Sequence, residues 1–353
     1  MTNTVYINGR AIGPQHPPYI IAELSANHNG SLANALLSLE VFKSCGADAV
    51  KIQSYTADTM TIDCDRPEFK IQGGLWDGYT LYELYKEAHT PFEWHQALFD
   101  KAAELELTLF SSPFDESAVD LLESLNAPAY KVASFEATDL PLIAYIAKTG
   151  KPLIISTGMA SLEEIEEAVS CAKNNGCREL VLLHCISAYP APVEQANLAT
   201  IQDLAKRFGC VVGLSDHSLG NIVATTAVSL GAALIEKHVT LDRNQPGPDS
   251  AFSLEPHELK ELCNQTKLAW QAVGQIDYSR KKSEEANLQF RRSIYFVKEM
   301  RAGEKINKKH IRRIRPGLGL EPKFYEQLLG REVVQDIKPG MACAWNLLKP
   351  IDS

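Results

Sequence analysis

The sequence has no long apolar segment and no cysteine pairing motif. No stretch of its 353 residues approaches the roughly 20 apolar residues that a membrane helix needs. The opening residues, MTNTVYINGR, have neither the basic part nor the apolar part of a secretory signal. The eight cysteines form no CxxC motif and several lie within apolar runs, which is typical of reduced, buried thiols. We therefore expect a globular, cytoplasmic protein that does not associate with membranes.

Positive charge is scarce outside one segment. The formal net charge is -9, yet residues 280–315 contain thirteen Lys or Arg against four Asp or Glu. Nucleic-acid binding is one interpretation of such a segment, but it lacks aromatic residues at a base-stacking spacing. The rest of the chain, with 22 basic and 40 acidic residues, would repel a phosphate backbone. We expect no nucleic-acid partner and a small anionic substrate instead.

No GxGxxG motif follows the first apolar run, which argues against a doubly wound dinucleotide-binding sheet. A different pattern is present: a short apolar run, a polar segment and a helical pattern, repeated along the chain. The predicted strands are residues 19–22, 49–52, 107–110, 129–133, 153–155, 180–183, 211–214 and 234–235. Helical patterns between them include residues 31–44, 92–105, 161–174 and 198–208. Eight such units over about 250 residues predict an α/β fold, a TIM (β/α)8 barrel.

The barrel pattern does not account for the whole chain. A turn at Asn8-Gly9 predicts a hairpin before the first barrel strand, placed to plug the barrel floor. We assign residues 1–276 to the barrel domain and the polar residues 277–289 to a linker. Short strand-like runs with Gly and Pro turns predict a small, mostly β domain over residues 290–353.

The longest insertion, residues 56–90, follows the second predicted strand and contains LWDGYTLYELYKEAH. In a barrel, loops at this end of the strands build the pocket, so the aromatic residues favour a role in substrate specificity. An equally good interpretation is a helix whose aromatic side chains cover the barrel.

Two histidines, His217 and His238, follow the last two predicted strands, 21 residues apart. Because adjacent parallel strands end at the same rim, both imidazoles can reach one point and bind one divalent metal ion. The alternative is that each is a core or rim histidine whose hydrogen bonds are satisfied without a metal. The charged neighbours Asp216, Glu236 and Lys237 favour a functional site, because charged groups at barrel strand ends mark sites more often than packing.

Each predicted strand brings a polar residue to the same rim, within the strand or just after it. Besides the two histidines, these residues include Glu23, Lys51, Ser112, Lys131, Ser134, Glu136, Ser156, Ser187, Tyr189 and Ser215. Two lysines with several hydroxyls suit a phosphate group, since ammonium supplies charge and hydroxyls donate hydrogen bonds. A surface ion pair is the alternative for either lysine alone.

The order of several motifs resembles that of the sialic acid synthase family. The motifs are IIAELSANHNG, KIQSY, SSPFD, YKVASFE, STGM, YPAP, GLSDH, EKH and GPD, and the tail segments RRSIYF and RRIRPGLGL resemble the antifreeze-like (SAF, β-clip) domain of these enzymes. The resemblance covers nearly the full length. The segments most similar to the pseudaminic acid synthases of this family are ELSANHNGS, GGLWDGYTLYELYKEAHTPFEWH, SSPFD, ISAYPAP and FSLEP.

This resemblance implies a metal-dependent condensation of phosphoenolpyruvate with an open-chain acetamido sugar, which gives a nine-carbon keto acid and phosphate. The pseudaminic pattern implies 2,4-diacetamido-2,4,6-trideoxy-altrose as acceptor and a product used in surface glycans, including those of flagellin. N-acetylmannosamine or the legionaminic acid precursor are alternative acceptors, although N-acetylneuraminate synthases have Asn where this chain has Ser187. A third interpretation makes residues 290–353 a module that binds polysaccharide or ice on a non-catalytic barrel.

The resemblance also implies residue roles. His217 and His238 would bind the metal, Mn²⁺, Mg²⁺ or Co²⁺. Residues expected around phosphoenolpyruvate are Lys51, Ser112, Lys131, Ser134, Ser156 and Ser215, and those expected at the acceptor or in catalysis are Glu23, Glu136, Ser187, Tyr189 and Asp249. Arg315 would reach an N-acetyl group of the sugar bound by the partner subunit, which implies a domain-swapped homodimer.

Overall fold

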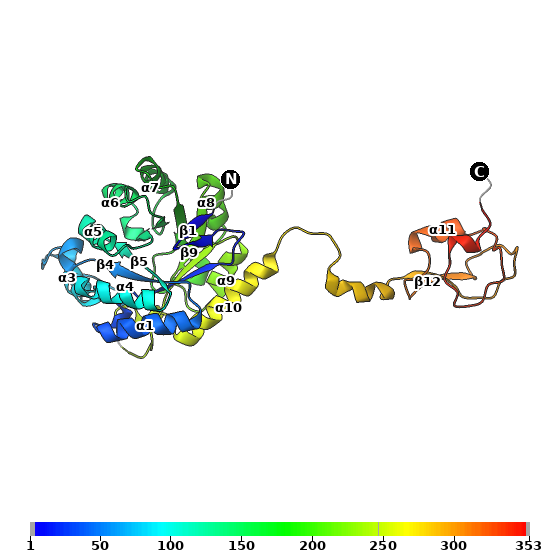
Figure 1. The fold of residues 1–353 in the computed structure, drawn as a ribbon, viewed down its shortest axis with the longest axis horizontal. Coiled ribbons are helices and arrows are strands. Elements are labelled where there is room, and N and C mark those ends of the chain that lie inside the picture. The colour runs from blue at the N-terminus through cyan, green and yellow to red at the C-terminus, as the bar shows by residue number, and fades with distance from the viewer. Residues whose placement is uncertain (1–3, 246, 351–353) are drawn as a thin grey trace. The chain divides into compact units, whose positions relative to one another are not determined.

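The computed structural model describes residues 4–245 and 247–350 and divides into two compact units between Gly274 and Gln275 (Figure 1). Within those residues, no helix is both long enough and apolar enough to cross a membrane.

The first unit is a closed barrel of eight parallel strands, in the order β10-β3-β4-β5-β6-β7-β8-β9. The strands are β3 (Tyr19–Glu23), β4 (Ala49–Ser54), β5 (Thr108–Pro113), β6 (Tyr130–Val132), β7 (Leu153–Ser156), β8 (Leu180–Cys185), β9 (Val211–Asp216) and β10 (Leu234–His238). Each contains or overlaps one of the predicted apolar runs, so the TIM-barrel prediction is confirmed.

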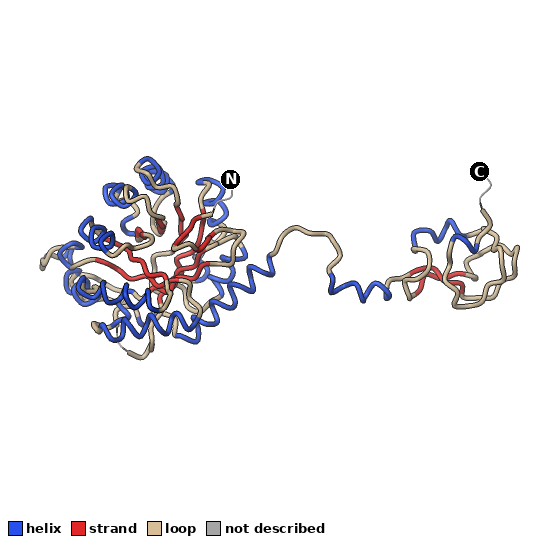
Figure 2. Tube along the Cα trace, in the orientation of Figure 1, coloured by secondary structure: helices blue, strands red, loops and turns tan. Residues whose placement is uncertain are grey.

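Helices surround the strands (Figure 2). They are α1 (Leu32–Cys45), α4 (His95–Glu104), α5 (Glu116–Ser124), α6 (Leu140–Ala147), α7 (Leu162–Asn174), α8 (Thr200–Phe208), α9 (Ile222–Ser229) and α10 (Pro256–Val273). Local sequence sets their ends: α7 begins with a capping box in which Ser161 Oγ accepts from the Glu164 backbone N–H and the Glu164 carboxylate accepts from that of Ser161.

Side chains alternate between the two faces of each strand, and this alternation builds two cores. Outward residues such as Val50 and Leu182 pack with the helices in the larger core. Inward residues such as Phe110 and Val181 pack with Ile7 of the hairpin β1 (Val5–Ile7) and β2 (Arg10–Ile12). The hairpin thus shares the inner core at the N-terminal end of the strands, which leaves polar residues at their C-terminal ends.

The 56–90 insertion folds into α2 (Ala57–Met60), η2 (Pro67–Phe69) and α3 (Leu81–Ala88). Thr80 and Glu83 form a capping box that begins α3. The insertion therefore contains the helix that was one of its two interpretations, and its inner side lines a cavity described below.

The second unit, described by itself, pairs β11 (Ser293–Phe296) with β12 (Ile311–Ile314) in antiparallel orientation and includes α11 (Tyr325–Leu328). Its small core includes Ile294, Phe296 and Leu328. Most of its remaining pairing is by isolated bridges. The segment expected to be a linker, 277–289, overlaps a 3-10 helix, η7 (Lys282–Phe290).

Candidate active site

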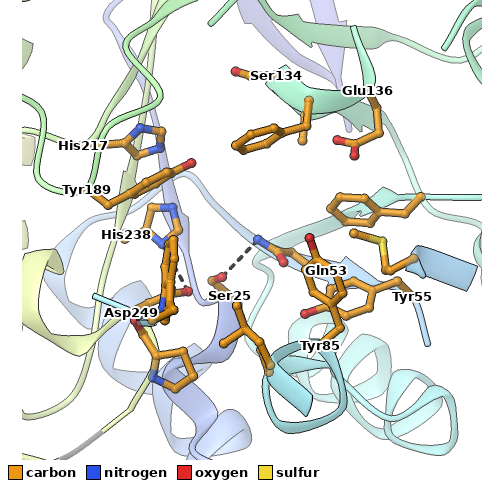
Figure 3. A pocket seen from close by; sticks show the side chains of 18 of the residues that line it. Ser25, Gln53, Tyr55, Tyr85, Ser134, Glu136, Tyr189, His217, His238 and Asp249 are labelled. Carbon is orange, nitrogen blue, oxygen red and sulfur yellow. Dashed lines mark hydrogen bonds and ion pairs between the residues drawn. The ribbon is translucent and has the colours of Figure 1, made fainter. Parts of the chain in front are cut away.

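A cavity of about 420 Å³ opens at the C-terminal ends of the barrel strands (Figure 3). Its polar lining residues are Ser25, Lys51, Gln53, Lys131, Ser134, Glu136, Tyr189, Ser215, His217, Glu236, His238 and Asp249. Most of these residues occur in pairs that are two positions apart in the sequence, on a strand or just beyond its end. Lys51 and Gln53 on β4 are one such pair. The spacing arises because alternate side chains of a strand point inward. The cavity therefore collects the inward polar groups of the barrel in one place.

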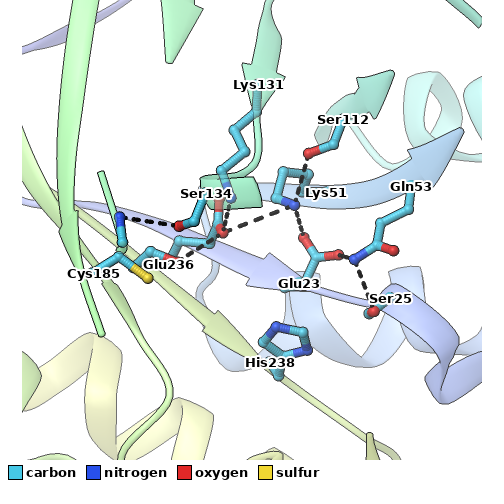
Figure 4. Close-up of polar contacts among 12 residues, drawn as sticks. Glu23, Ser25, Lys51, Gln53, Ser112, Lys131, Ser134, Cys185, Glu236 and His238 are labelled. Atoms are coloured by element: carbon cyan, nitrogen blue, oxygen red, sulfur yellow. Dashed lines mark hydrogen bonds and ion pairs between the residues drawn. The ribbon is translucent and has the colours of Figure 1, made fainter. Parts of the chain in front are cut away.

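A buried charge network forms the floor of this cavity (Figure 4). Lys51 Nζ lies 2.5 Å from Glu23 Oε2 and 3.8 Å from Glu236 Oε1. Lys131 Nζ donates to the same Glu236 oxygen at 2.9 Å, and Ser215 Oγ donates to it at 3.2 Å. One carboxylate on β10 thus holds two lysines from β4 and β6.

Burial and neighbouring charge oppose each other in this network. Burial would raise the pKa of Glu236, but Lys131 and Lys51 outweigh it and lower that pKa to about 2. Burial would lower the pKa of Lys131, but Glu236 and Glu23 together outweigh burial and raise it. At Glu23 burial dominates over the attraction of Lys51, and the pKa is raised. Glu236 and Lys131 are therefore charged at neutral pH, whereas Glu23 holds its proton more readily than an exposed glutamate.

The serines expected around a phosphate differ in their contacts. Ser112 Oγ accepts from Lys51 Nζ at 3.1 Å, and Ser134 Oγ accepts from the Gly158 backbone N–H at 3.2 Å. Ser156 Oγ is buried and has no hydrogen-bond partner within residues 4–245 and 247–350. Of these hydroxyls, Ser112 bonds Lys51 directly, and Ser215 bonds the Glu236 carboxylate that both lysines share.

His217 and His238 lie side by side, with ring centroids 5.4 Å apart. His217 Nδ1 faces the Ile186 carbonyl at 3.0 Å, which leaves Nε2 for another ligand. His238 Nδ1 is buried without a hydrogen-bond partner in the described part of the chain. Burial lowers the pKa of His238 well below 6.5, so this imidazole is neutral, as a metal ligand must be.

The protonation of His217 differs. Burial is the largest single influence and would lower its pKa, but the Cys185 sulfur, 3.8 Å from Nδ1, and the Ile186 carbonyl together raise it. Binding of a cation at Nε2 would require loss of the proton there, while Nδ1–H stays on the Ile186 carbonyl. The described residues contain no group of three or more His, Cys, Asp or Glu placed to hold a metal ion. Two neighbouring imidazoles would suit a divalent ion that takes its remaining ligands from substrate or water.

Three further predicted residues line the same cavity, and two of them lie close to the histidines. Tyr189 packs against His217 with ring centroids 4.3 Å apart, and Asp249 Oδ2 lies 3.8 Å from His238 Nδ1. Burial raises the pKa of Asp249. Glu136 also lines the cavity, and burial raises its pKa to about 7.

Five predicted residues are not among those that line the cavity: Glu23, Ser112, Ser156, Ser187 and Arg315. Glu23 and Ser112 both contact Lys51, which does line it. Ser187 Oγ lies 3.8 Å from Cys185 Sγ. Arg315 belongs to the second unit, where it lines a hollow of about 500 Å³ with Arg291 and Arg292.

Sequence reasoning missed several lining residues. The missed polar residues are Ser25, Gln53 and Glu236, and the missed apolar or aromatic ones include Tyr55, Met60, Phe114 and Phe135. Leu84 and Tyr85 also line the cavity and lie in the aromatic segment for which a role in specificity was one interpretation. Glu236 was noted only as a charged neighbour of His238. Strand alternation was the available signal, because Glu236 is two residues before His238 and Gln53 is two residues after Lys51.

Comparison with known proteins decides the family. The NeuB family model matches residues 38–278, and the SAF domain model matches residues 291–348. The chain belongs to the NeuB family. The resemblance found in its motifs is thereby confirmed.

Characterised relatives narrow the comparison further. The chain is 44% identical to the pseudaminic acid synthase of Helicobacter pylori over 91% of this chain and 95% of that protein. It is 38% identical to the N,N'-diacetyllegionaminic acid synthase of Campylobacter jejuni over 90% of this chain and 96% of that protein. The crystal structure of an N-acetylneuraminic acid synthetase from Leptospira borgpetersenii superposes with a TM-score of 0.74 at 31% identity, covering 82% of this chain and 96% of that one.

Proposed function

We propose that the protein is a pseudaminic acid synthase, which condenses phosphoenolpyruvate with 2,4-diacetamido-2,4,6-trideoxy-altrose to give pseudaminic acid and phosphate. The observation that carries this proposal is the cavity floor, where Lys51 and Lys131 share Glu236 beside two histidines, in a chain with 44% identity to pseudaminic acid synthases. Because phosphoenolpyruvate is a cytoplasmic metabolite, we expect a cytoplasmic location. The product would then enter a surface glycan, such as one carried by flagellin.

Phosphoenolpyruvate would bind over the two lysines. Lys51 and Lys131 are buried, so their attraction for phosphate and carboxylate oxygens is weakly screened by water. Ser134 and Ser156 would donate hydroxyl hydrogen bonds to the remaining oxygens. This arrangement would orient the enol carbon toward the histidine side of the cavity.

His217 and His238 would hold a divalent ion, Mn²⁺, Mg²⁺ or Co²⁺. When bound there, the ion would supply a Lewis acid that polarises the sugar aldehyde. Asp249, close to His238, and Tyr189, stacked on His217, would orient the sugar beside that aldehyde.

The reaction also needs proton transfers. As the enol carbon bonds to the aldehyde carbon, the aldehyde oxygen takes up a proton and becomes a hydroxyl. Water then adds at C2 of the former phosphoenolpyruvate and gives up a proton. Finally, the C2–O bond to phosphate breaks as the new C2 hydroxyl loses its proton and becomes the keto group. Glu23 is our candidate to accept the proton of that water, because burial raises its pKa and Lys51 stabilises its charged form.

Removal of a histidine tests the metal assignment. We expect His238→Ala to abolish turnover, since loss of one of two protein ligands should collapse metal affinity while the barrel stays folded. Calorimetric titration of the purified protein with Mn²⁺ should show binding for the wild type and none for the variant, and a chelator should inactivate the wild type. The exposed His257→Ala is the matched control. Full activity of His238→Ala in metal-free buffer would refute the assignment.

We further propose that the protein is a domain-swapped homodimer in which Arg315 of one subunit completes the site of the other. Mixing Arg315→Ala chains with His217→Ala chains should restore activity, because a mixed dimer combines an intact barrel with an intact arginine. No recovery under conditions in which subunits demonstrably exchange would refute the trans arrangement. Truncation near Arg280 should leave a folded barrel with little activity.

A legionaminic or N-acetylneuraminate synthase is the second candidate, supported by the 38% identity to a legionaminic acid synthase. Phosphate release from phosphoenolpyruvate, measured with each candidate sugar offered separately, distinguishes them. We expect the fastest release with the trideoxy-altrose acceptor. Faster release with N-acetylmannosamine or with the legionaminic acid precursor would transfer the assignment to the corresponding synthase.

A further inference from the structure

One wall of the cavity is apolar and comes from the 56–90 insertion. Its aliphatic residues are Met60, Ile71, Leu81, Leu84 and Ala88. Figure 3 shows Tyr55 and Tyr85 on the opposite side of the pocket from His217 and His238. The cavity therefore has a charged, histidine-bearing side and an alkyl and aromatic side.

Packing and one hydrogen bond hold this wall in place. The Trp76 indole N–H donates to the Pro248 carbonyl at 2.9 Å, and its ring lies 5.7 Å from that of Tyr189. Tyr55 makes edge contacts with Tyr85 at 5.9 Å and with Phe114 at 5.1 Å. The insertion is therefore tied to the barrel at its tip and its base, which preorganises the wall.

Two hydroxyls interrupt the apolar surface. Neither Tyr55 nor Tyr85 has a hydrogen-bond partner for its hydroxyl in the described ranges 4–245 and 247–350, although both residues line the cavity. Burial raises the pKa of both, so each keeps its proton and remains a donor. Alkyl groups beside O–H donors match an acylamino group, whose methyl is apolar and whose carbonyl accepts.

We propose that this wall is the subsite for an N-acyl group at the end of the acceptor sugar remote from its aldehyde. The inference rests on the proposed function, because an aldehyde near His217 and His238 directs the rest of an open-chain sugar across the cavity. In a 2,4-diacetamido-2,4,6-trideoxy sugar, the C4 acetamido group is at that end. Its carbonyl accepts from Tyr85, and its methyl packs on Met60 and Leu84.

Selectivity follows from the same contacts. A free amine or a hydroxyl at C4 would lose its hydration against alkyl chains, and the tyrosine donors would lose their acceptor. Differences of this kind change kcat/KM by roughly 10- to 100-fold.

The test uses two acceptors of the same stereochemistry that differ only at C4, one acetylated and one with a free amine. Phosphate release from phosphoenolpyruvate gives kcat/KM for each. We expect the wild type to favour the acetylated sugar by about 10- to 100-fold. Tyr85→Phe and Met60→Gln, which nearly conserve volume, should lower kcat/KM for the acetylated sugar only. Tyr79→Phe is the control, since Tyr79 lies in the same insertion but its hydroxyl donates to Glu87.

Each outcome decides the proposal. Equal use of both sugars by the wild type would refute the subsite and leave the proposed function standing. If neither sugar supports phosphate release, the proposed function is refuted and the subsite with it. Equal losses for both sugars in Tyr85→Phe and Met60→Gln would assign the wall a structural role and overturn the proposal. If Tyr85→Phe melts at a lower temperature than the wild type, Met60→Gln alone carries the test.

Discussion

Strands β9 and β10 together carry buried charged residues on the inner and the outer face of the barrel, and these residues have different roles on the two faces. On the inner face, Glu236 and its lysines border a cavity. On the outer face, Lys237 Nζ lies 2.7 Å from Asp216 Oδ2 and donates to the Ser218 carbonyl at 2.6 Å. Asp216 Oδ1 accepts from the Ser218 backbone N–H at 2.9 Å. The outer pair therefore joins the two strands and the turn after His217.

Contact with the cavity, rather than solvent exposure, separates the two arrangements. The side chains of Lys237 and Asp216 are 1% and 2% exposed and do not line the cavity. Those of Lys51 and Lys131 are only 2% and 6% exposed but do line it. The inner lysines face a cavity in which an anion can compete with Glu236. A buried pair that joins two strands preserves geometry, whereas a buried pair at a cavity serves binding. This difference predicts opposite consequences of removing a lysine from each face.

Loss of the outer lysine should have the largest effect on stability. Lys237→Met leaves Asp216 buried without its cation, which should lower the free energy of unfolding by about 3–5 kcal/mol. Urea denaturation measures this change. The double variant Asp216→Asn with Lys237→Met should recover much of the loss, because no unpaired charge remains. If Lys237→Met lowers the free energy of unfolding by less than about 1 kcal/mol, as loss of a surface ion pair would, the outer pair is not the structural link proposed here.

Loss of an inner lysine should affect binding more than stability. Lys131→Ala should weaken the binding of phosphoenolpyruvate by about 2–4 kcal/mol if the lysine contacts the phosphate in this shielded site. The loss should appear in kcat/KM, mostly through a higher KM. Steady-state kinetics and urea denaturation of the same variant separate the two effects. The exposed Lys206→Ala is the control. An unchanged KM with a stability loss as large as that of Lys237→Met would contradict the comparison.

Substitution of Glu136 should have the smallest effect on stability, because Glu136 belongs to neither of the two lysine–carboxylate pairs. Its Oε2 is buried without a hydrogen-bond partner in the described part of the chain. Burial raises its pKa from 4.5 to about 7. Between these values the unfolded chain ionises first, so this glutamate costs stability increasingly as the pH rises toward 7. Glu136→Gln should thus stabilise the protein at pH 8 relative to wild type and have little effect at pH 4.5. Urea midpoints measured at both pH values test this, and an equal difference at both would contradict the raised pKa.

Much of the fold was predictable because its causes are local. Each of the eight apolar runs is short and followed by a helical pattern, and parallel units of this kind close into one barrel. Strand ends such as Lys51 and His238 then had to meet at one rim. The same alternation could have found Glu236 and Gln53, since every second residue of a strand shares a face.

The sequence by itself determined the order of the strands, the family motifs and the ends of helices such as α7, because these depend on neighbouring residues. Only the tertiary structure decided that Glu236 joins lysines of β4 and β6, since that contact requires barrel closure and register between distant segments. The tertiary structure likewise determined which residues form the apolar wall of the cavity. Met60, Tyr85 and Tyr189 share a cavity because the insertion folds back over the rim and Trp76 bonds to Pro248, and no local pattern encodes contacts between such distant residues.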